Sequence, residues 1–224
     1  MEKYLKLLKQ SQLFRNVEEK EILSLLKCIA YKIVNYTNKQ NVFYEGDTID
    51  KIGIVVNGSV HIVQDDFWGN RSIIAHITPC NLFGEVFAFT KNKSLTVSVI
   101  TAEPSEIIFF DFKKLITVCH SACDFHNRII RNLLEIVAEK NIFITRKVQY
   151  LSKKTIREKL LFYLSDECKK QGERDFTIPF NRQQLADYLN VDRSALSNEL
   201  SKMSKEGAID YHKNVFRLKN DVIK

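Results

Sequence analysis

Residues 181–210 read "NRQQLADYLNVDRSALSNELSKMSKEGAID", and this stretch decides the fold of the C-terminal part of the chain. Apolar residues recur at helical spacing on both sides of a short interruption at Asn190-Val191. Asn181 and Gln184 have the spacing of a capping box, which predicts a helix that begins just after Asn181. Asn190 tolerates the left-handed conformation, and Asp192 can cap a second helix. The pattern therefore predicts two short helices joined by a tight turn.

The second predicted helix has two different faces. Leu196, Leu200 and Met203 fall on one side, where they can pack inward. The opposite side collects Arg193, Ser194, Ser197, Asn198, Ser201 and Lys202. Serine and asparagine are mediocre helix formers, but their short donors and acceptors suit base edges and phosphates in a DNA major groove. The alternative is a serine-rich exposed helix that binds nothing.

The side chains on this face and near it predict contacts with DNA bases and phosphates. Arg193 can fork onto a guanine or hold a phosphate, and Asn198 can pair bidentately with an adenine. Arg182, at the start of the first helix, and Lys202 are placed to touch phosphates. The predicted DNA-binding set is Arg182, Gln183, Arg193, Ser194, Ser197, Asn198, Lys202 and Lys213.

Short elements flank this helical pair. Upstream, "TIREKLLFYLSDECKK" predicts a helix ended by Gly172, and "FTIPF" predicts a short strand. Downstream, "IDYHKNVFRL" predicts two strands joined at Lys213-Asn214.

A long helix is predicted from about residue 123 to 151, because this stretch contains neither proline nor glycine. Alternating spacings of four and three define a heptad seam of Ile130, Leu134, Val137, Asn141, Ile144, Val148 and Leu151. A second apolar stripe is formed by Ile129, Leu133, Ile136 and Phe143. The two stripes predict a parallel homodimer in which the second stripe faces the helix's own domain. Asn141 in the seam would cost stability but fix the register. The alternative is one amphipathic helix that packs only on its own domain.

Residues 29–111 have the texture of a β domain, with short β-branched and aromatic runs between turn signals. Asn57-Gly58 predicts a two-residue hairpin, and "DFWGNR" at 66–71 predicts a second one. "LFGEVFAF" at 82–89 breaks the pattern with a Gly-Glu pair. We expect an antiparallel sandwich or barrel, preceded by a helical segment at about 1–25 and followed by a helix that Asp111 caps.

The bulk composition is that of a globular protein of one to two domains, with 224 residues and 45% hydrophobic content. A net charge of +7 mildly favours polyanionic partners. No apolar run could span a bilayer and "MEKYLKLLKQ" does not read as a signal peptide, so we expect a cytoplasmic protein without a membrane partner. Five scattered cysteines do not form a disulfide framework, and most are expected to be reduced thiols.

The stretch "RQQLADYLNVDRSALSNELSKMSKEGAI", followed by a strand pair, resembles the winged helix-turn-helix of the Crp/Fnr family of bacterial transcription regulators. Upstream, "YEGD", "GIVVNGSV", "FGE" and the long helix agree with that resemblance, which covers essentially the whole chain. It implies an α+β fold with an N-terminal double-stranded β-helix (jelly-roll) sensor barrel. The implied domains are this barrel with its N-terminal helix at 1–118, a dimerisation helix at 119–151 and a winged helix-turn-helix at 152–224.

The resemblance also implies a homodimer that binds a palindromic operator in double-stranded DNA, with RNA polymerase as a further partner. Half-sites about one helical turn apart match a two-fold dimer. Arg193, Ser194, Ser197 and Asn198 fall on the base- and backbone-contacting positions of the family. Many members carry arginine where this chain has Asn198, so the base preference at that position is expected to differ.

Cyclic-nucleotide-binding members of the family hold ribose and phosphate with a "GE" pair and an arginine about eleven residues later. Gly84 and Glu85 are present, but no arginine lies between Arg71 and Arg128. A buried phosphate without a partner charge is expensive, which disfavours cyclic AMP and leaves another small-molecule effector open. The candidate effector pocket is Gly84, Glu85, Val86, Lys93, Ser94, Thr96 and Asn141.

Metal and catalytic chemistry are less well supported by the sequence. Cys119, His120, Cys123 and His126 have the residue types of a metal site but lack a second ligand pair, so no metal is predicted. An iron–sulfur cluster is disfavoured because Cys28 stands alone near the N-terminus, and nothing supports haem at His76 or Cys80. No catalytic constellation is present, so the chain is not expected to be an enzyme. The competing interpretation is a ligand-binding signalling module of the cyclic-nucleotide type whose helical tail docks a protein.

Overall fold

The computed structural model describes residues 2–90, 94–116 and 124–219. The chain divides into two compact units. The N-terminal unit consists of Met1–Asp65 with Ile74–Asn141, and the C-terminal unit consists of Asp66–Ile73 with Ile142–Lys224.

The N-terminal unit begins with two helices and a short turn of 3-10 helix between them. These elements are α1 (Glu2–Gln10), η1 (Gln12–Phe14) and α2 (Glu19–Cys28). The predicted helical segment at 1–25 is therefore interrupted. The Ser11 side chain accepts a hydrogen bond from the backbone of Leu13, and Asn16 adopts a positive φ of 61°. Both features redirect the chain, since serine and asparagine favour caps and turns over helix interiors.

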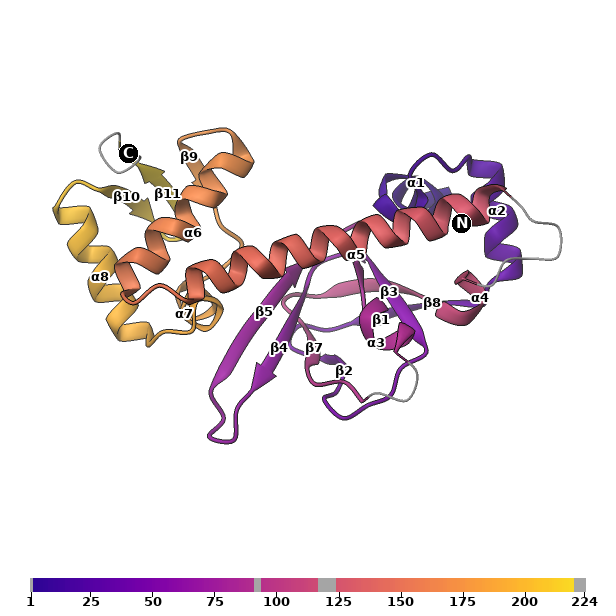
Figure 1. The fold of residues 1–224 in the computed structure, drawn as a ribbon, viewed down its shortest axis with the longest axis horizontal. Coiled ribbons are helices and arrows are strands. Elements are labelled where there is room, and N and C mark those ends of the chain that lie inside the picture. The colour runs from indigo at the N-terminus through magenta and orange to yellow at the C-terminus, as the bar shows by residue number, and fades with distance from the viewer. Residues whose placement is uncertain (1, 91–93, 117–123, 220–224) are drawn as a thin grey trace. The chain divides into compact units, whose positions relative to one another are not determined.

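Two four-stranded antiparallel sheets form the β domain (Figure 1). The first has the order β1 (Tyr31–Tyr36), β8 (Ser105–Asp111), β3 (Lys51–Asn57) and β6 (Leu82–Phe83). The second has the order β2 (Asn41–Phe43), β7 (Ser98–Thr101), β4 (Val60–Asp65) and β5 (Arg71–Ile77). Buried residues from both sheets share one core, including Val55, Phe83 and Phe109 from the first and Val60 and Val99 from the second. This arrangement confirms the predicted jelly-roll sandwich.

The hairpin predicted at Asn57-Gly58 is wrong. Strand β3 pairs with β8 and β6, whereas β4, directly after this turn, belongs to the other sheet. Gly58 has a φ of 77°, and a Cβ there would lie 2.4 Å from the Pro104 carbonyl oxygen. Glycine is required here because the backbone of another segment comes close where the chain crosses from one sheet to the other. An Asn-Gly pair looks the same in the sequence at such a crossing as it does in a hairpin turn.

The hairpin predicted at "DFWGNR" is confirmed, because β4 and β5 are neighbours in the sheet. At the tip, the Asp66 carboxylate accepts hydrogen bonds from the backbone N–H groups of Trp68 and Asn70. Phe67 and Trp68 are 95% and 82% exposed. The turn therefore presents two aromatic side chains to solvent.

Three further helices, α3 (Glu85–Phe89), α4 (Phe112–Ile116) and α5 (Asp124–Leu151), follow later in the chain. The Asp111 carboxylate accepts a hydrogen bond from the backbone N–H of Lys114, which confirms the predicted cap. The predicted inward stripe is confirmed for three of its four members, because Ile129, Leu133 and Ile136 are buried in the core that α1, η1 and α2 share with the first sheet. Phe143, the fourth member, is half-buried. Figure 1 shows α1 and α2 beside the N-terminal part of α5.

The C-terminal unit contains α6 (Ile156–Gln171), β9 (Asp175–Thr177), α7 (Arg182–Leu189), α8 (Arg193–Lys205), β10 (Ile209–His212) and β11 (Val215–Leu218). The three strands form one antiparallel sheet in the order β10-β11-β9. Gly172 ends α6 in the left-handed conformation, as expected from the sequence. Helices α6 and α7 both pack against α8, so the helical pair forms a small core with the sheet behind it (Figure 1).

Candidate functional site

Capping residues define both the start of α7 and the turn between α7 and α8. The Asn181 side chain accepts from the Gln184 backbone, and the Gln184 side chain accepts from the Asn181 backbone, so the capping box is complete. Asn190 ends α7 at a φ of 51°, and the Asp192 carboxylate accepts from the Ala195 backbone at 2.7 Å. These local hydrogen bonds fix the angle at which α8 leaves the turn.

Helix α8 has the two faces that its sequence predicts. Leu196, Leu200 and Met203 are completely buried. On the opposite face, Arg193, Ser194, Asn198, Ser201 and Lys202 are exposed, and Ser197 is half-buried. The predicted DNA-binding residues of α8 therefore lie together on one surface of one helix.

Arg182 is held by the strand pair that follows α8. Its guanidinium lies 5.0 Å from the centre of the Tyr211 ring and donates to the Lys213 carbonyl at 3.4 Å. Burial in this position lowers the pKa of Arg182 from its ordinary value. The side chain thus ties the start of α7 to the turn between β10 and β11, a role the sequence did not reveal. Lys213 itself is exposed at that turn, with a φ of 54°.

Gln183 and Lys202, the remaining members of the predicted set, lie on different helices. Gln183 is exposed on α7 and donates to the Asp187 carboxylate at 2.8 Å. Lys202 is in the last turn of α8, where a cation is favoured by the helix dipole.

A buried lysine connects α5 to α7 inside the C-terminal unit. The ammonium of Lys147 lies 3.9 Å from the centre of the Tyr188 ring and donates to the carbonyl oxygen of Ile73. Only 7% of the residue is exposed, and this desolvation lowers the pKa of Lys147 to about 7. Sequence reasoning missed this contact because the three residues lie far apart in the chain.

The predicted seam of α5 is mostly exposed. Leu134, Val137, Ile144 and Val148 are between 41% and 66% exposed, and Asn141 is also exposed. Ile130 and Leu151, at the two ends of the seam, are half-buried. A row of large apolar side chains on a solvated helix face is unusual, since such a surface costs free energy unless a partner covers it.

The Gly84–Glu85 pair forms a sharp turn between β6 and α3. Gly84 has a φ of 86°, and a Cβ there would lie 3.2 Å from Ile49 and 3.4 Å from the Lys51 carbonyl oxygen. The turn directs Glu85 inward, so that the residue is 3% exposed. A buried carboxylate needs a partner, because an isolated buried charge is very costly.

The partner of Glu85 is Lys140 on α5. The Lys140 ammonium lies 2.8 Å from Glu85 Oε1 and donates to the carbonyl oxygen of Leu82 at 2.7 Å. Lys140 was not among the predicted pocket residues, although its neighbour Asn141 was. A separation of 55 residues hides this pair from local sequence patterns.

Among the predicted pocket residues that the structure describes, Glu85 alone is buried. Val86 is 53% exposed, and Ser94 and Thr96 are exposed. Between the latter two, Leu95 is buried and exchanges backbone hydrogen bonds with Gly46 and Asp47. Lys93 lies outside the described residues.

The candidate metal cluster falls mainly outside the described residues, since only His126 of its four members is described. Among the residues that the structure covers, no group of three or more potential metal ligands occurs. Burial raises the pKa of the Cys80 thiol, which disfavours the reactive thiolate form. Burial also lowers the pKa of His76, whose ring centre lies 5.0 Å from that of His61.

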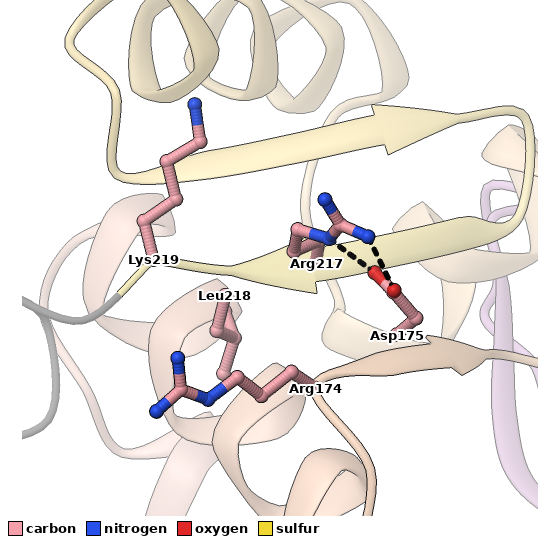
Figure 2. Close-up of a pocket in the computed structure, with 5 residues that line it drawn as sticks. All are labelled: Arg174, Asp175, Arg217, Leu218 and Lys219. Carbon is pink, nitrogen blue, oxygen red and sulfur yellow. Dashed lines mark hydrogen bonds and ion pairs between the residues drawn. The ribbon is translucent and has the colours of Figure 1, made fainter.

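A shallow pocket of about 380 Å³ lies on the C-terminal sheet, lined by Arg174, Asp175, Arg217, Leu218 and Lys219 (Figure 2). Asp175 accepts two hydrogen bonds from the Arg217 guanidinium, and Lys219 pairs with Asp210 at 2.9 Å. Figure 2 shows the Arg174 guanidinium pointing away from the Asp175–Arg217 pair. Sequence reasoning did not single out this pocket, and two of its three cations are already neutralised.

Two family models match this chain. Residues 33–122 match the model of the cyclic nucleotide-binding domain, and residues 158–220 match that of the Crp-like helix-turn-helix domain. The chain belongs to the Crp/Fnr family of transcription regulators. The two matched regions correspond to the jelly roll and to the helical pair with its strands.

Two curated relatives illustrate this membership. The transcriptional activator protein FnrL of Cereibacter sphaeroides is 22% identical over 85% of this chain and 77% of its own length. The cAMP-activated global transcriptional regulator Vfr of Pseudomonas aeruginosa is 24% identical over 78% of this chain and 83% of its own. These relatives are transcription regulators, which confirms the prediction of a regulator that is not an enzyme.

Solved structures share the same fold. The c-di-GMP responsive global regulator CLP of Xanthomonas campestris superposes with a TM-score of 0.73 at 18% identity, covering 91% of this chain and all of that one. FixK2 of Bradyrhizobium japonicum gives a TM-score of 0.67 at 18% identity, covering 85% and 93% of the two chains. Across the described ranges, no helix is long and apolar enough to cross a membrane.

Proposed function

We propose that this Crp/Fnr regulator acts as a homodimer that reads a palindromic DNA operator and responds to an effector in its barrel. The observation that carries the proposal is the outer face of α8, where six polar residues gather on a helix whose opposite face is fully buried. Short polar side chains on such a helix can reach base edges in a major groove. Arg193 and Asn198 are the proposed base readers, and Arg182, Gln183, Ser194, Ser197, Lys202 and Lys213 are proposed to contact the DNA around them.

Two-fold symmetry in the proposed operator rests on the exposed seam of α5. Pairing two copies of this row would cover apolar surface that is otherwise solvated, with Asn141 setting the register. We assign the sensing, dimerising and reading roles to residues 1–118, 119–151 and 152–224, respectively. RNA polymerase is the proposed further partner of the DNA-bound dimer.

The effector is the part of the proposed function in which the similar proteins are not alike. The similar proteins differ in this respect, because Vfr is described as cAMP-activated and CLP as c-di-GMP responsive. Glu85 is already paired with Lys140 in this chain. We therefore propose an effector other than cyclic AMP.

Selection from a random DNA library tests the proposal directly. The purified chain is expected to enrich a sequence with two inverted half-sites whose centres lie about 10 base pairs apart. Light scattering of the isolated complex is expected to give two chains per duplex. Enrichment of no sequence, or of a single half-site bound by one chain, would contradict the proposal.

A seam variant tests the dimer separately. Asn141→Leu is expected to tighten self-association and loosen the register, because a polar seam residue trades stability for specificity. Analytical ultracentrifugation measures the dissociation constant of the variant against that of the unmodified chain. A wild-type chain that stays monomeric at micromolar concentration would remove the basis of this expectation.

A further inference from the structure

We propose that Lys140 is a tethered ligand of the Gly84–Glu85 turn, so that the chain's own ammonium occupies the carboxylate that an effector would otherwise contact. The inference rests on the proposed function, because it treats this turn as the effector site. It goes further by naming what keeps that site occupied and what an effector must displace.

The geometry of the contact is that of a ligand held at two points. Lys140 donates to the Glu85 carboxylate at 2.8 Å and to the Leu82 backbone carbonyl at 2.7 Å. Both acceptors belong to the short segment of β6 and α3 that makes the turn. One ammonium group therefore fixes the main chain and the functional side chain of the turn at once.

The turn itself has little freedom to move away from Lys140. Gly84 is in the left-handed conformation, and its Cα region is enclosed by Ile49, Lys51 and Phe43. Glu85 is almost completely buried, and its second oxygen, Oε2, has no hydrogen-bond partner among the described residues. Removing Lys140 would leave a buried carboxylate without a cation, and one of its two oxygens already lacks a hydrogen-bond partner. The free energy of this turn therefore depends strongly on the contact with Lys140.

The same arrangement restricts which ligands can compete. An ionised carboxylate only accepts hydrogen bonds, so a group that replaces Lys140 must be a donor, such as a hydroxyl or an amine. A cyclic phosphate would instead add a negative charge beside Glu85 while drawing Lys140 away from it. The ribose hydroxyl of a cyclic nucleotide is such a donor, but the negative charge of the attached phosphate disfavours cyclic nucleotides at this site. The geometry therefore favours neutral or cationic hydrogen-bond donors.

The tether also joins the turn to the dimer seam. Lys140 precedes Asn141 on α5, and its side chain is 32% exposed, so it is accessible to a competing ligand. Release of Lys140 would free this part of α5 from the barrel directly beside a seam residue. An effector that binds better when Lys140 is released would shift the equilibrium between these two states.

A double-mutant cycle in the full chain tests the tether. The variants are Lys140→Met, Glu85→Gln and the two combined, and Lys32→Met, an exposed lysine of β1, is the matched control. Lys140→Met leaves a buried carboxylate unpaired and is expected to lower the melting temperature by roughly 5 °C or more, whereas the control changes it by about 1 °C or less. The double variant is expected to be more stable than Lys140→Met, because it removes both partners. If the changes in melting temperature of Lys140→Met and Glu85→Gln simply add in the double variant, the proposal is overturned.

Two further readouts address function. Hydrogen exchange is expected to increase in Lys140→Met at α3 and near residue 140, but not in Lys32→Met. Millimolar cyclic AMP is expected to leave the melting temperature of the unmodified chain unchanged, and a clear rise would overturn the proposal. Failure of the unmodified chain to select any DNA would contradict the proposed function alone, because the melting cycle does not involve DNA. A cycle without coupling would contradict the tether even if operator binding is found.

Discussion

The outer face of α8 and the Gly84–Glu85 turn are both candidate sites, yet they present their polar side chains in opposite ways. Arg193, Ser194 and Asn198 are exposed, whereas Glu85 is 3% exposed and already paired with Lys140. The face of α8 needs only a correctly placed helix to be ready for a ligand. At the turn, a ligand would first have to displace the Lys140 ammonium, which belongs to the same chain.

The two candidate sites also differ in which part of the sequence determines them. The surface of α8 follows from the helical period and from caps within a few residues of it. The state of Glu85 follows from a contact with a residue 55 positions away. One region is therefore specified locally and the other by the tertiary fold.

The strongest test of the α8 scaffold is a change on its buried face. Leu200→Ala is expected to lower the free energy of unfolding by about 2–5 kcal/mol, because Leu200 is completely buried and its loss leaves a cavity. Chemical denaturation with a probe in the C-terminal unit measures the loss. A cost below about 0.5 kcal/mol would mean that α8 is not anchored as described.

A second test concerns pH and the buried Lys147. Its pKa of about 7 in the folded state lies below the ordinary value of 10.5, so the unfolded chain binds more protons between these values. Stability should therefore rise as pH increases above 7, by up to about 1.4 kcal/mol per pH unit from this group. The difference in unfolding free energy between the unmodified chain and Lys147→Met isolates this contribution.

Calorimetry from pH 6 to 9 provides that difference. We expect the unfolding free energy of Lys147→Met to exceed that of the unmodified chain most at the acidic end of this range, where Lys147 is charged and buried. Lys202→Met, an exposed lysine in the same unit, serves as the control with a constant difference. A constant difference for Lys147→Met as well would argue against a perturbed, buried ammonium.

A smaller effect is expected at the cap of α8. Asp192→Ala removes the acceptor of the Ala195 backbone N–H and should cost about 1 kcal/mol of stability. Asp192→Asn retains an acceptor and should cost much less. Thermal melts of the two variants compare these costs, and equal losses would show that the charge matters more than the hydrogen bond.

Most of the C-terminal fold could be predicted from the sequence, because its signals are local. The capping box at Asn181, the left-handed Asn190 and the cap at Asp192 all appear in the structure as expected. The contacts of Arg182 with Tyr211 and of Lys147 with Tyr188 could not be predicted, since they depend on how distant elements pack.

The β domain shows the same limit more clearly. Its short alternating strands predicted a sandwich correctly, but Asn57-Gly58 was assigned to a hairpin that does not exist. A turn residue reports the local backbone conformation and says nothing about which sheet the next strand joins. The contact between Glu85 and Lys140 could not be predicted for the same reason, because Lys140 is on a helix that no local pattern connects to Glu85.

The central claim, that the outer face of α8 reads DNA sequence, is tested most directly by operator affinity in Arg193→Ala. Fluorescence anisotropy on the selected operator is expected to show a loss of about 1–3 kcal/mol, roughly fivefold to 150-fold in affinity, with relaxed preference at one base pair. The matched control Arg174→Ala removes an exposed cation away from α8 and should bind as the unmodified chain does. Unchanged affinity and base preference in Arg193→Ala would contradict the assignment of α8 as the reading helix.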